Sequence, residues 1–160
     1  MQIRLATIAD SRRISDFIMP IARAQIGPTL SEAGLSELLA GMTQENQVER
    51  IQSGFPFFLG YLDEKILGIA AVRPPCHLYY LFVEPNRQRQ GIGRQLWTHV
   101  RKWISPSPLQ HSITVNSSLN AISAYLEFGF ALDGPAQEIH GVRFQPMRAN
   151  LATECSDSRR

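Results

Sequence analysis

Residues 83–94, Val-Glu-Pro-Asn-Arg-Gln-Arg-Gln-Gly-Ile-Gly-Arg, decide the fold because they join a predicted strand to a predicted helix. Residues 77–83, which precede the turn, are apolar on both faces, and this pattern is typical of a central strand covered on both sides. The residues after the turn predict a helix over 90–105, because apolar side chains recur there at helical spacing. These side chains belong to Ile92, Leu96, Val100 and Trp103.

The two glycines of this stretch favour an anion site. Gly91 and Gly93 have no Cβ, so their backbone can approach a ligand closely and adopt angles that other residues avoid. The first N–H groups of the following helix lack partners within it and lie at the positive end of its dipole. Arg87, Arg89 and Arg94 add positive charge, so we expect a phosphate or pyrophosphate here. A glycine turn in a solvated charge cluster is the alternative interpretation of this pattern alone.

Two common nucleotide-binding motifs do not fit the same residues. A Walker loop needs Gly-Lys-Ser/Thr, whereas Arg94 and Gln95 follow Gly93. A dinucleotide fingerprint needs a third small residue where Leu96 stands. The sequence therefore disfavours NTP hydrolysis, and it leaves a dinucleotide-binding oxidoreductase as a weaker alternative.

Outward from the turn, the sequence predicts the element order β, α, α, β, β, β, α, β, α, β, β. Asp10 or Ser11 should cap a helix that has a kink or break at Pro20. A second helix should begin at residues 29–32, which have capping-box spacing, and another should cover 119–128. Besides the central strand, strands are expected at 2–6, 55–62, 66–72, 112–115, 130–139 and 142–147.

Composition indicates one globular domain. The chain has 160 residues, of which 44% are hydrophobic and 19% charged, and this balance excludes disordered, collagen-like and coiled-coil classes. A net charge of +2 is too small to indicate nucleic acid as a partner. We expect the domain to cover residues 1–149 and residues 150–160 to form a polar, disordered tail.

The sequence lacks the patterns typical of membrane or secreted proteins and of metal sites. The sequence has neither a signal region nor an apolar run approaching the roughly 20 residues that cross a bilayer. We therefore expect a cytoplasmic protein with no membrane partner. Cys76 and Cys155 are far apart, so no disulfide framework is expected. No metal is predicted, because no cluster of His, Cys, Asp and Glu has the spacing of a metal site.

The chain resembles the GNAT superfamily of N-acetyltransferases, which bind acetyl-CoA through Gln/Arg-x-x-Gly-x-Gly/Ala. The match is Gln88-Arg89-Gln90-Gly91-Ile92-Gly93, preceded by Val83-x-Pro85. Residues 121–130, AISAYLEFGF, are similar to the family's later helix and its Tyr-x-x-x-Gly-Phe ending. The resemblance covers about residues 3–148. It implies an α/β (α+β) fold with a mixed, mostly antiparallel central sheet flanked by helices, in which the central strands splay apart.

The resemblance also implies where acetyl-CoA binds. Strand-like backbone hydrogen bonds would hold the pantetheine arm, and they come from Leu81, Phe82 and Val83. Main-chain N–H groups would hold the pyrophosphate, and they come from Arg89, Gln90, Gly91, Ile92, Gly93 and Arg94. Many family members place an asparagine seven residues before the motif tyrosine, but that position is Ser118 here. Of the neighbouring Asn116 and Asn120, we favour Asn116 as the cofactor contact.

Tyr125 is the expected general acid, which the resemblance assigns to protonation of the departing CoA thiolate. A thiol of pKa about 8.5 and a phenol of pKa about 10 are close enough for this proton transfer. A core tyrosine is the alternative, and both roles can hold together. The general base stays open among His77, Tyr79, Glu84 and a chain of waters.

The resemblance implies direct transfer of an acetyl group from acetyl-CoA to a primary amine of a small molecule or peptide. No covalent acyl-enzyme is expected, because neither cysteine has the motif partners of an activated nucleophile. A non-catalytic acyl-CoA-binding module is the second alternative. The acceptor, the preferred acyl chain and the oligomeric state, including a homodimer, stay open.

Overall fold

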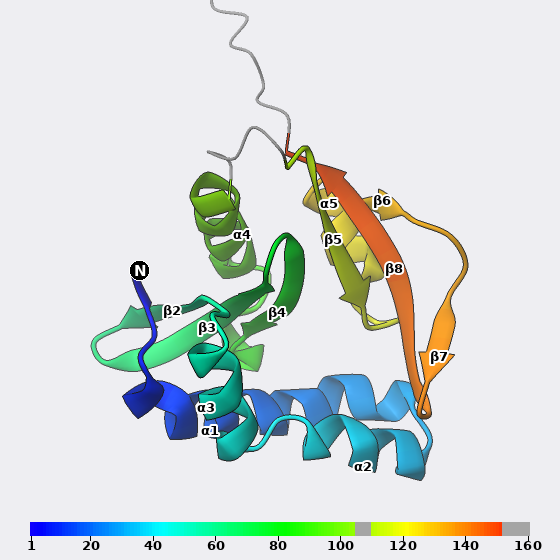
Figure 1. Cartoon of the computed structure of the whole chain (residues 1–160), viewed down its shortest axis with the longest axis horizontal. Helices are drawn as coiled ribbons and strands as arrows, with labels where there is room; N and C mark the ends of the chain where they lie inside the picture. The colour runs from blue at the N-terminus through cyan, green and yellow to red at the C-terminus, as the bar shows by residue number, and fades with distance from the viewer. Residues whose placement is uncertain (105–109, 152–160) are drawn as a thin grey trace, which may run out of the picture.

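A mixed β-sheet organises the chain, whose computed structural model describes residues 1–104 and 110–151 (Figure 1). These residues form eight strands, of which seven follow the order β1-β2-β3-β4-β5-β8-β6, while β7 lies off this path and pairs with β8. The strands are β1 (Gln2–Leu5), β2 (Phe57–Leu62), β3 (Lys65–Arg73), β4 (His77–Val83), β5 (Ser112–Ser117), β6 (Ala131–Leu132), β7 (Gln137–Ile139) and β8 (Val142–Asn150). The helices are α1 (Ser11–Ile21), α2 (Glu32–Ala40), α3 (Gln44–Gln52), α4 (Ile92–Ile104) and α5 (Ile122–Glu127).

The two central strands separate soon after they meet. β4 and β5 run parallel and pair at two positions, His77 with Thr114 and Leu78 with Val115. Beyond Leu78 the two strands diverge (Figure 1), and β5 pairs along its whole length with β8. The other strand pairs are antiparallel. The expected fold class, a mixed and mostly antiparallel sheet with splayed central strands, is confirmed.

A β-bulge in β4 changes which face its side chains occupy. Ala71 pairs with Tyr80 and Val72 pairs with Leu78, so Tyr79 is an extra residue on β4. Such a bulge shifts the alternation of side chains by one position. Tyr79 and Tyr80 therefore lie on the same face of the sheet, and their ring centroids are 4.7 Å apart.

Apolar cores cover both faces of the sheet. α4 and α5 pack against one face, and α1, α2 and α3 pack against the other. The first core includes Leu78, Leu96, Val100, Ile113 and Met147. The second includes Ile14, Ile18, Phe57, Leu59 and Ile69. Because alternate residues of β3 enter the two cores, this strand is apolar throughout its interior.

The α-helices differ from the expected ones at three places. α1 continues through Pro20 and is followed at Ala22–Ile26 by a π-helical turn. The second helix, in contrast, begins at Glu32, inside the expected range, and Ser31 caps it by accepting from the Gly34 N–H. α3 was not predicted, and Thr43 caps it. Trp103, expected in the buried stripe of α4, is 47% exposed.

The last strand runs just past residue 149, where the domain is expected to end. β8 extends through Asn150, and Leu151 is buried. The rest of the expected tail, with Cys155, lies outside the described residues. Within residues 1–104 and 110–151, no helix is both long enough and apolar enough to span a membrane.

The first prediction concerns the contact between α2 and the turn that joins β7 to β8. A Cβ at Gly34 would overlap the carbonyl group of Gly141, so the two backbones can touch only because residue 34 is glycine. We expect Gly34→Ala to lower the free energy of unfolding by about 1–3 kcal/mol, although alanine favours helices. Urea denaturation measures this change. Gly41→Ala is the control, because a Cβ there would make only ordinary contacts; equal stability of the two variants would contradict the prediction.

The second prediction concerns an ion pair that links β1 to the start of α1. Arg4 donates to both carboxylate oxygens of Asp10 at 2.8 and 2.9 Å, and the Thr7 N–H donates to the same group at 2.9 Å. These hydrogen bonds lower the pKa of Asp10 to about 2, despite its burial. The stabilisation is therefore present above the unfolded-state pKa, about 4, and is lost as the pH falls towards 2.

We accordingly expect Asp10→Asn to cost about 1–3 kcal/mol of unfolding free energy at pH 7. The difference from the wild type should shrink as the pH falls from about 4 to about 2. Urea denaturation at pH 7 and at low pH measures both values. A difference that stays constant over this range would show that the carboxylate charge does not stabilise the fold.

Candidate active site

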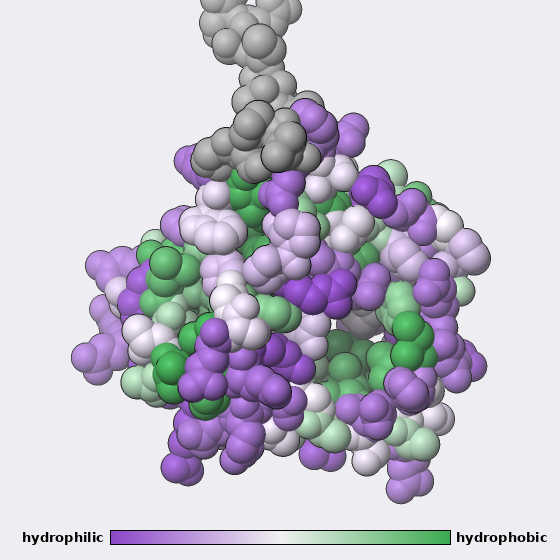
Figure 2. Space-filling model, in the orientation of Figure 1, coloured by the Kyte–Doolittle hydropathy of each residue, from purple (hydrophilic) through white to green (hydrophobic). Residues whose placement is uncertain are grey.

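A cavity of about 750 Å³ lies where β4 and β5 diverge. The strands β4, β5 and β8 contribute to its walls, together with the start of α4, with α5 and with residues from the α1–α3 region. Figure 2 shows the molecule hollowed on this face, with apolar residues inside the hollow. A cavity of this size matches the usual range for small-molecule sites.

One wall of the cavity is the edge of β4 that faces away from β3. Leu81, Phe82 and Val83 line the cavity, and they pair with β3 along their other edge. In the described part of the chain, no strand pairs with this free edge of β4 beyond Leu78. Gln88 partly covers it, because its Nε2 donates to the Val83 carbonyl at 3.2 Å. The remaining polar groups of the edge can bind a ligand that forms strand-like hydrogen bonds.

The glycine turn lies next to this edge, and its two glycines have different structural roles. Gly91 has a φ of +86°, a left-handed conformation that favours glycine, and a Cβ there would meet no atom within 4 Å. At Gly93 a Cβ would lie 3.3 Å from the Phe128 ring, so glycine there permits close packing between α4 and α5. Both glycines line the cavity.

Of the remaining motif residues, some line the cavity and some do not. Arg89 and Arg94 line the cavity, whereas the side chains of Gln90 and Ile92 do not. Gln90 is exposed, and its amide donates to the Asn86 carbonyl at 3.3 Å. Ile92 is 7% exposed and packs in the core. Any contact of Gln90 or Ile92 with a ligand in the cavity would therefore use the main chain, as the sequence analysis expected.

The positive charge near the turn is partly neutralised. Arg89 forms an exposed ion pair with Glu127 at 3.2 Å. The guanidinium carbon of Arg94 lies 5.5 Å from the centroid of the Phe128 ring. The first N–H groups of α4 point away from the helix without helical partners, as at any helix start. The turn thus offers oriented N–H donors with two arginines beside them.

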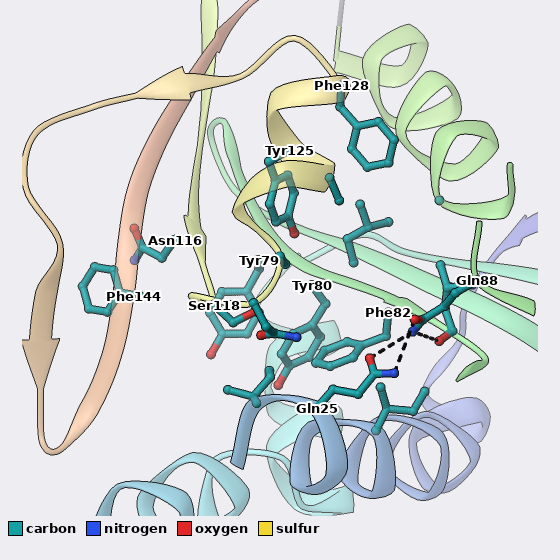
Figure 3. Close-up of a pocket in the computed structure, with 18 of the residues that line it drawn as sticks. Gln25, Tyr79, Tyr80, Phe82, Gln88, Asn116, Ser118, Tyr125, Phe128 and Phe144 are labelled. Carbon is teal, nitrogen blue, oxygen red and sulfur yellow. Dashed lines mark hydrogen bonds between the residues drawn. The ribbon is translucent and has the colours of Figure 1, made fainter. Parts of the chain in front are cut away.

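Tyr125 brings a phenol hydroxyl to the cavity from α5. Its ring packs edge-on against Phe128 and Phe130, with centroids 6.2 and 5.4 Å away. The hydroxyl points into the cavity (Figure 3). Burial raises the pKa of Tyr125 well above its ordinary value, so the phenol stays protonated at neutral pH. Tyr125 is therefore both a core residue and a hydrogen-bond donor to the cavity.

The three candidates for the expected asparagine contact all line the cavity. Asn116 is exposed on β5, Ser118 is half-buried after it, and Asn120 is exposed before α5. In Figure 3, Asn116 and Ser118 both lie beside the cavity. Because all three residues line the cavity, their position does not show which of them contacts the cofactor.

The candidate bases, in contrast, are separated by the structure. Tyr79 lines the cavity, but His77 and Glu84 do not. The Nδ1 of His77 lies 2.8 Å from the Thr114 hydroxyl, at the closed end of the β4–β5 pair. Burial and the nearby charge of Arg73 lower the pKa of His77 to about 4. His77 is therefore neutral at pH 7 and is not part of the cavity wall.

Several residues of this cavity were not predicted from the sequence. Gln25, from the π-helical turn, exchanges two amide hydrogen bonds with Gln88, of 2.9 and 3.3 Å (Figure 3). Arg50 comes from α3, the helix that was not predicted. Tyr80 and Phe144 also line the cavity. No local pattern marks these residues, because strands and helices distant in sequence bring them here.

Comparison with known proteins gives the family. A family model described as "Acetyltransferase (GNAT) domain" matches residues 26–151. No curated protein matches the chain.

Several solved structures share the fold. One is a GCN5-related N-acetyltransferase from Rhodopseudomonas palustris, with 18% identity, a TM-score of 0.77 and coverage of 93% of this chain and 94% of that chain. Another is the PaiA N-acetyltransferase from Thermoplasma acidophilum in complex with coenzyme A, with 17% identity, a TM-score of 0.73 and coverage of 94% and 99%. A ribosomal-protein-alanine N-acetyltransferase from Brucella melitensis has 20% identity, a TM-score of 0.67 and coverage of 94% and 99%.

The family match spans well over half of the chain, and the sheet with its splayed central strands agrees with the fold of these structures. The chain belongs to the GNAT acetyltransferase family and is an acyltransferase.

Proposed function

We propose that this acyltransferase moves the acetyl group of acetyl-CoA directly to a primary amine. The observation that carries the proposal is that a single cavity unites the free edge of β4, the N-terminal turn of α4 and the hydroxyl of Tyr125. Coenzyme A in the related Thermoplasma acidophilum structure supports the choice of cosubstrate. The acyltransferase assignment leaves the non-catalytic binding module and the oxidoreductase without support.

The residues present fit acetyl-CoA. Its pantetheine amides match the free backbone edge at Leu81, Phe82 and Val83, because an extended arm with amides can add to a strand. Its diphosphate matches the N–H groups of the turn at residues 89–94, at the positive end of the α4 dipole. Asn116 is the proposed polar contact from the facing strand β5.

The chemistry needs an electrophile, a proton donor and a route for the amine proton. Acetyl-CoA supplies a thioester carbonyl, which the amine attacks. Backbone N–H groups of β4 stabilise the negative charge on the carbonyl oxygen. Tyr125, held protonated by burial, donates its proton to the CoA sulfur. Of the three side chains considered as base, Tyr79 alone lines the cavity. Its phenol can accept a proton only while it passes its own on, so the amine proton ends on a water, either directly or by relay through Tyr79.

The third prediction tests the acid. Tyr125→Phe removes the hydroxyl and keeps the ring contacts, so we expect kcat to fall by about 100-fold or more and the Kd for acetyl-CoA to change less than twofold. Release of free CoA across a panel of amines, amino acids, aminoglycosides and peptides measures kcat, and calorimetry measures Kd. Tyr61→Phe is the control, since Tyr61 does not line this cavity. Full activity of Tyr125→Phe would refute the assigned role.

The fourth prediction tests the turn. Gly91→Ala places a Cβ on a residue with φ of +86°, which costs on the order of 1–3 kcal/mol unless the turn moves. Because movement misaligns the N–H donors, we expect the Kd for acetyl-CoA to rise by about tenfold. Gly54→Ala is a matched control, because Gly54 has a φ of +97°, similarly open surroundings and no place in this cavity.

Calorimetry with acetyl-CoA compares the two glycine variants. Equal affinity of Gly91→Ala and Gly54→Ala would mean that the turn does not hold the cosubstrate. A thermal melt of each variant shows whether the strain itself is similar.

A further inference from the structure

Arg50 is a half-buried cation in the cavity wall that has neutral partners. It lies in the last turn of α3 and lines the cavity. Its Nη1 donates to the Tyr80 hydroxyl at 3.1 Å and to the Gln47 Oε1 at 3.4 Å. Its guanidinium carbon lies 4.9 Å from the Tyr79 ring centroid and 5.7 Å from that of Tyr80. Two aromatic rings and two neutral oxygens therefore fix the position of this charge.

The other edge of the same guanidinium has no partner among the described residues. The hydrogen bonds of the Arg50 side chain there use Nη1 alone, which leaves Nη2 and Nε. Nη2 faces Gly41, another residue of the cavity wall, since a Cβ on Gly41 would lie 3.7 Å from it. The carboxylate that α2 contributes to the cavity wall, Glu37, is exposed and makes no salt bridge with Arg50.

This arrangement differs from that of the other arginines in the cavity wall. Arg89 is paired with Glu127, and Arg143 is paired with Glu138 at 3.0 Å. Arg94 lies at the glycine turn, where the proposed diphosphate binds. Arg50 has no such carboxylate partner among the described residues and does not lie at the glycine turn. Neither a protein carboxylate nor the cosubstrate therefore accounts for its charge.

The position of Arg50 relative to β4 indicates which part of the reaction it serves. The proposed diphosphate site follows Val83, and the proposed arm runs back along β4 past Leu81. Tyr79 and Tyr80 precede Leu81, so they lie towards the reactive end of the arm, and Arg50 packs on both rings. The bulge at Tyr79 is the reason that both rings face this helix.

We propose that the acceptor is an amine that also carries a carboxylate, and that Arg50 binds this carboxylate; the inference rests on the proposed function. The free Nη2–Nε edge of a guanidinium presents two parallel N–H donors, which match the two oxygens of a carboxylate. The rings of Tyr79 and Tyr80 hold the guanidinium in place before the acceptor binds, so little side-chain entropy is lost on binding. The substrate class is therefore amino acids or peptides with a free carboxylate.

Matched acceptor pairs test this inference with the full chain. The pairs are phenylalanine and phenylalaninamide, methionine and methioninamide, and glycylphenylalanine and its C-terminal amide. Each pair is assayed for release of free CoA with the wild type, Arg50→Gln, Arg50→Lys and Arg101→Gln. Arg101 is the matched control, because it also stacks on an aromatic ring, that of Trp97 at 5.9 Å, and does not line the cavity.

We expect at least one carboxylate-bearing acceptor to have a kcat/KM at least tenfold above that of its amide. Arg50→Gln should reduce this preference to less than threefold by lowering kcat/KM for the carboxylate member alone. Arg50→Lys, which keeps the charge without the paired donors, should be intermediate. Arg101→Gln should match the wild type. The Kd for acetyl-CoA should change less than twofold in every variant, and this also shows that each variant is folded.

A binding measurement covers acceptors that turn over slowly. Calorimetry in the presence of CoA compares N-acetylphenylalanine with N-acetylphenylalaninamide, and the wild type should bind the carboxylate form at least tenfold more tightly than Arg50→Gln does.

The inference would be overturned if, in the wild type, the carboxylate and amide members of every pair had equal kcat/KM and equal Kd. It would also be overturned if Arg50→Gln lowered kcat/KM equally for both members of a pair. If the wild type releases CoA with other primary amines of the panel while these results fail, the proposed function stands and only the acceptor class is wrong. If acetyl-CoA does not bind to the wild type, the proposed function fails, and the acceptor inference fails with it.

Discussion

The divergence of β4 from β5 after two residue pairs is the constraint on which the rest of the structure depends. Backbone N–H and C=O groups need partners wherever they are buried, so a strand in mid-sheet with an open edge requires something to fill that edge. The open edge and the cavity have the same cause, because the strands that separate also form two of its walls. A cosubstrate with an extended, amide-containing arm suits this edge better than a compact ligand does.

The bulge at Tyr79 adds a second consequence to this divergence. Without it, successive residues of β4 would alternate, and Tyr79 and Tyr80 would lie on opposite faces. With it, both rings lie on the face covered by α1, α2 and α3, where Arg50 packs on them. One irregularity in a central strand thus builds the part of the cavity wall that the two rings and Arg50 form.

Two side-chain contacts connect the glycine turn to other parts of the cavity wall. The exposed pair of Arg89 with Glu127 joins the turn to α5, which carries Tyr125. The amide pair of Gln25 with Gln88 joins the same turn to the π-helical segment after α1. An exposed ion pair contributes at most about 1 kcal/mol to stability, so core packing of Tyr125 and Phe128, more than this pair, holds α5 in place. The turn is the point at which both connections meet.

The sequence alone determined the features that local patterns specify. Four features can be predicted because each depends on neighbours within a few residues. They are the apolar run of β4, the glycine turn, the apolar stripe of α4 and the tyrosine of α5. α3 was missed because its stretch, QENQVERIQ, is mostly polar and has only Val48 and Ile51 as apolar residues. The tertiary structure alone decided that Tyr79 and Arg50 line the cavity and that His77 and Glu84 do not. The reason is that the side of the sheet on which each of these side chains lies depends on a bulge and on strand pairing. The paired residues are far apart in the chain, so local spacing does not encode the pairing.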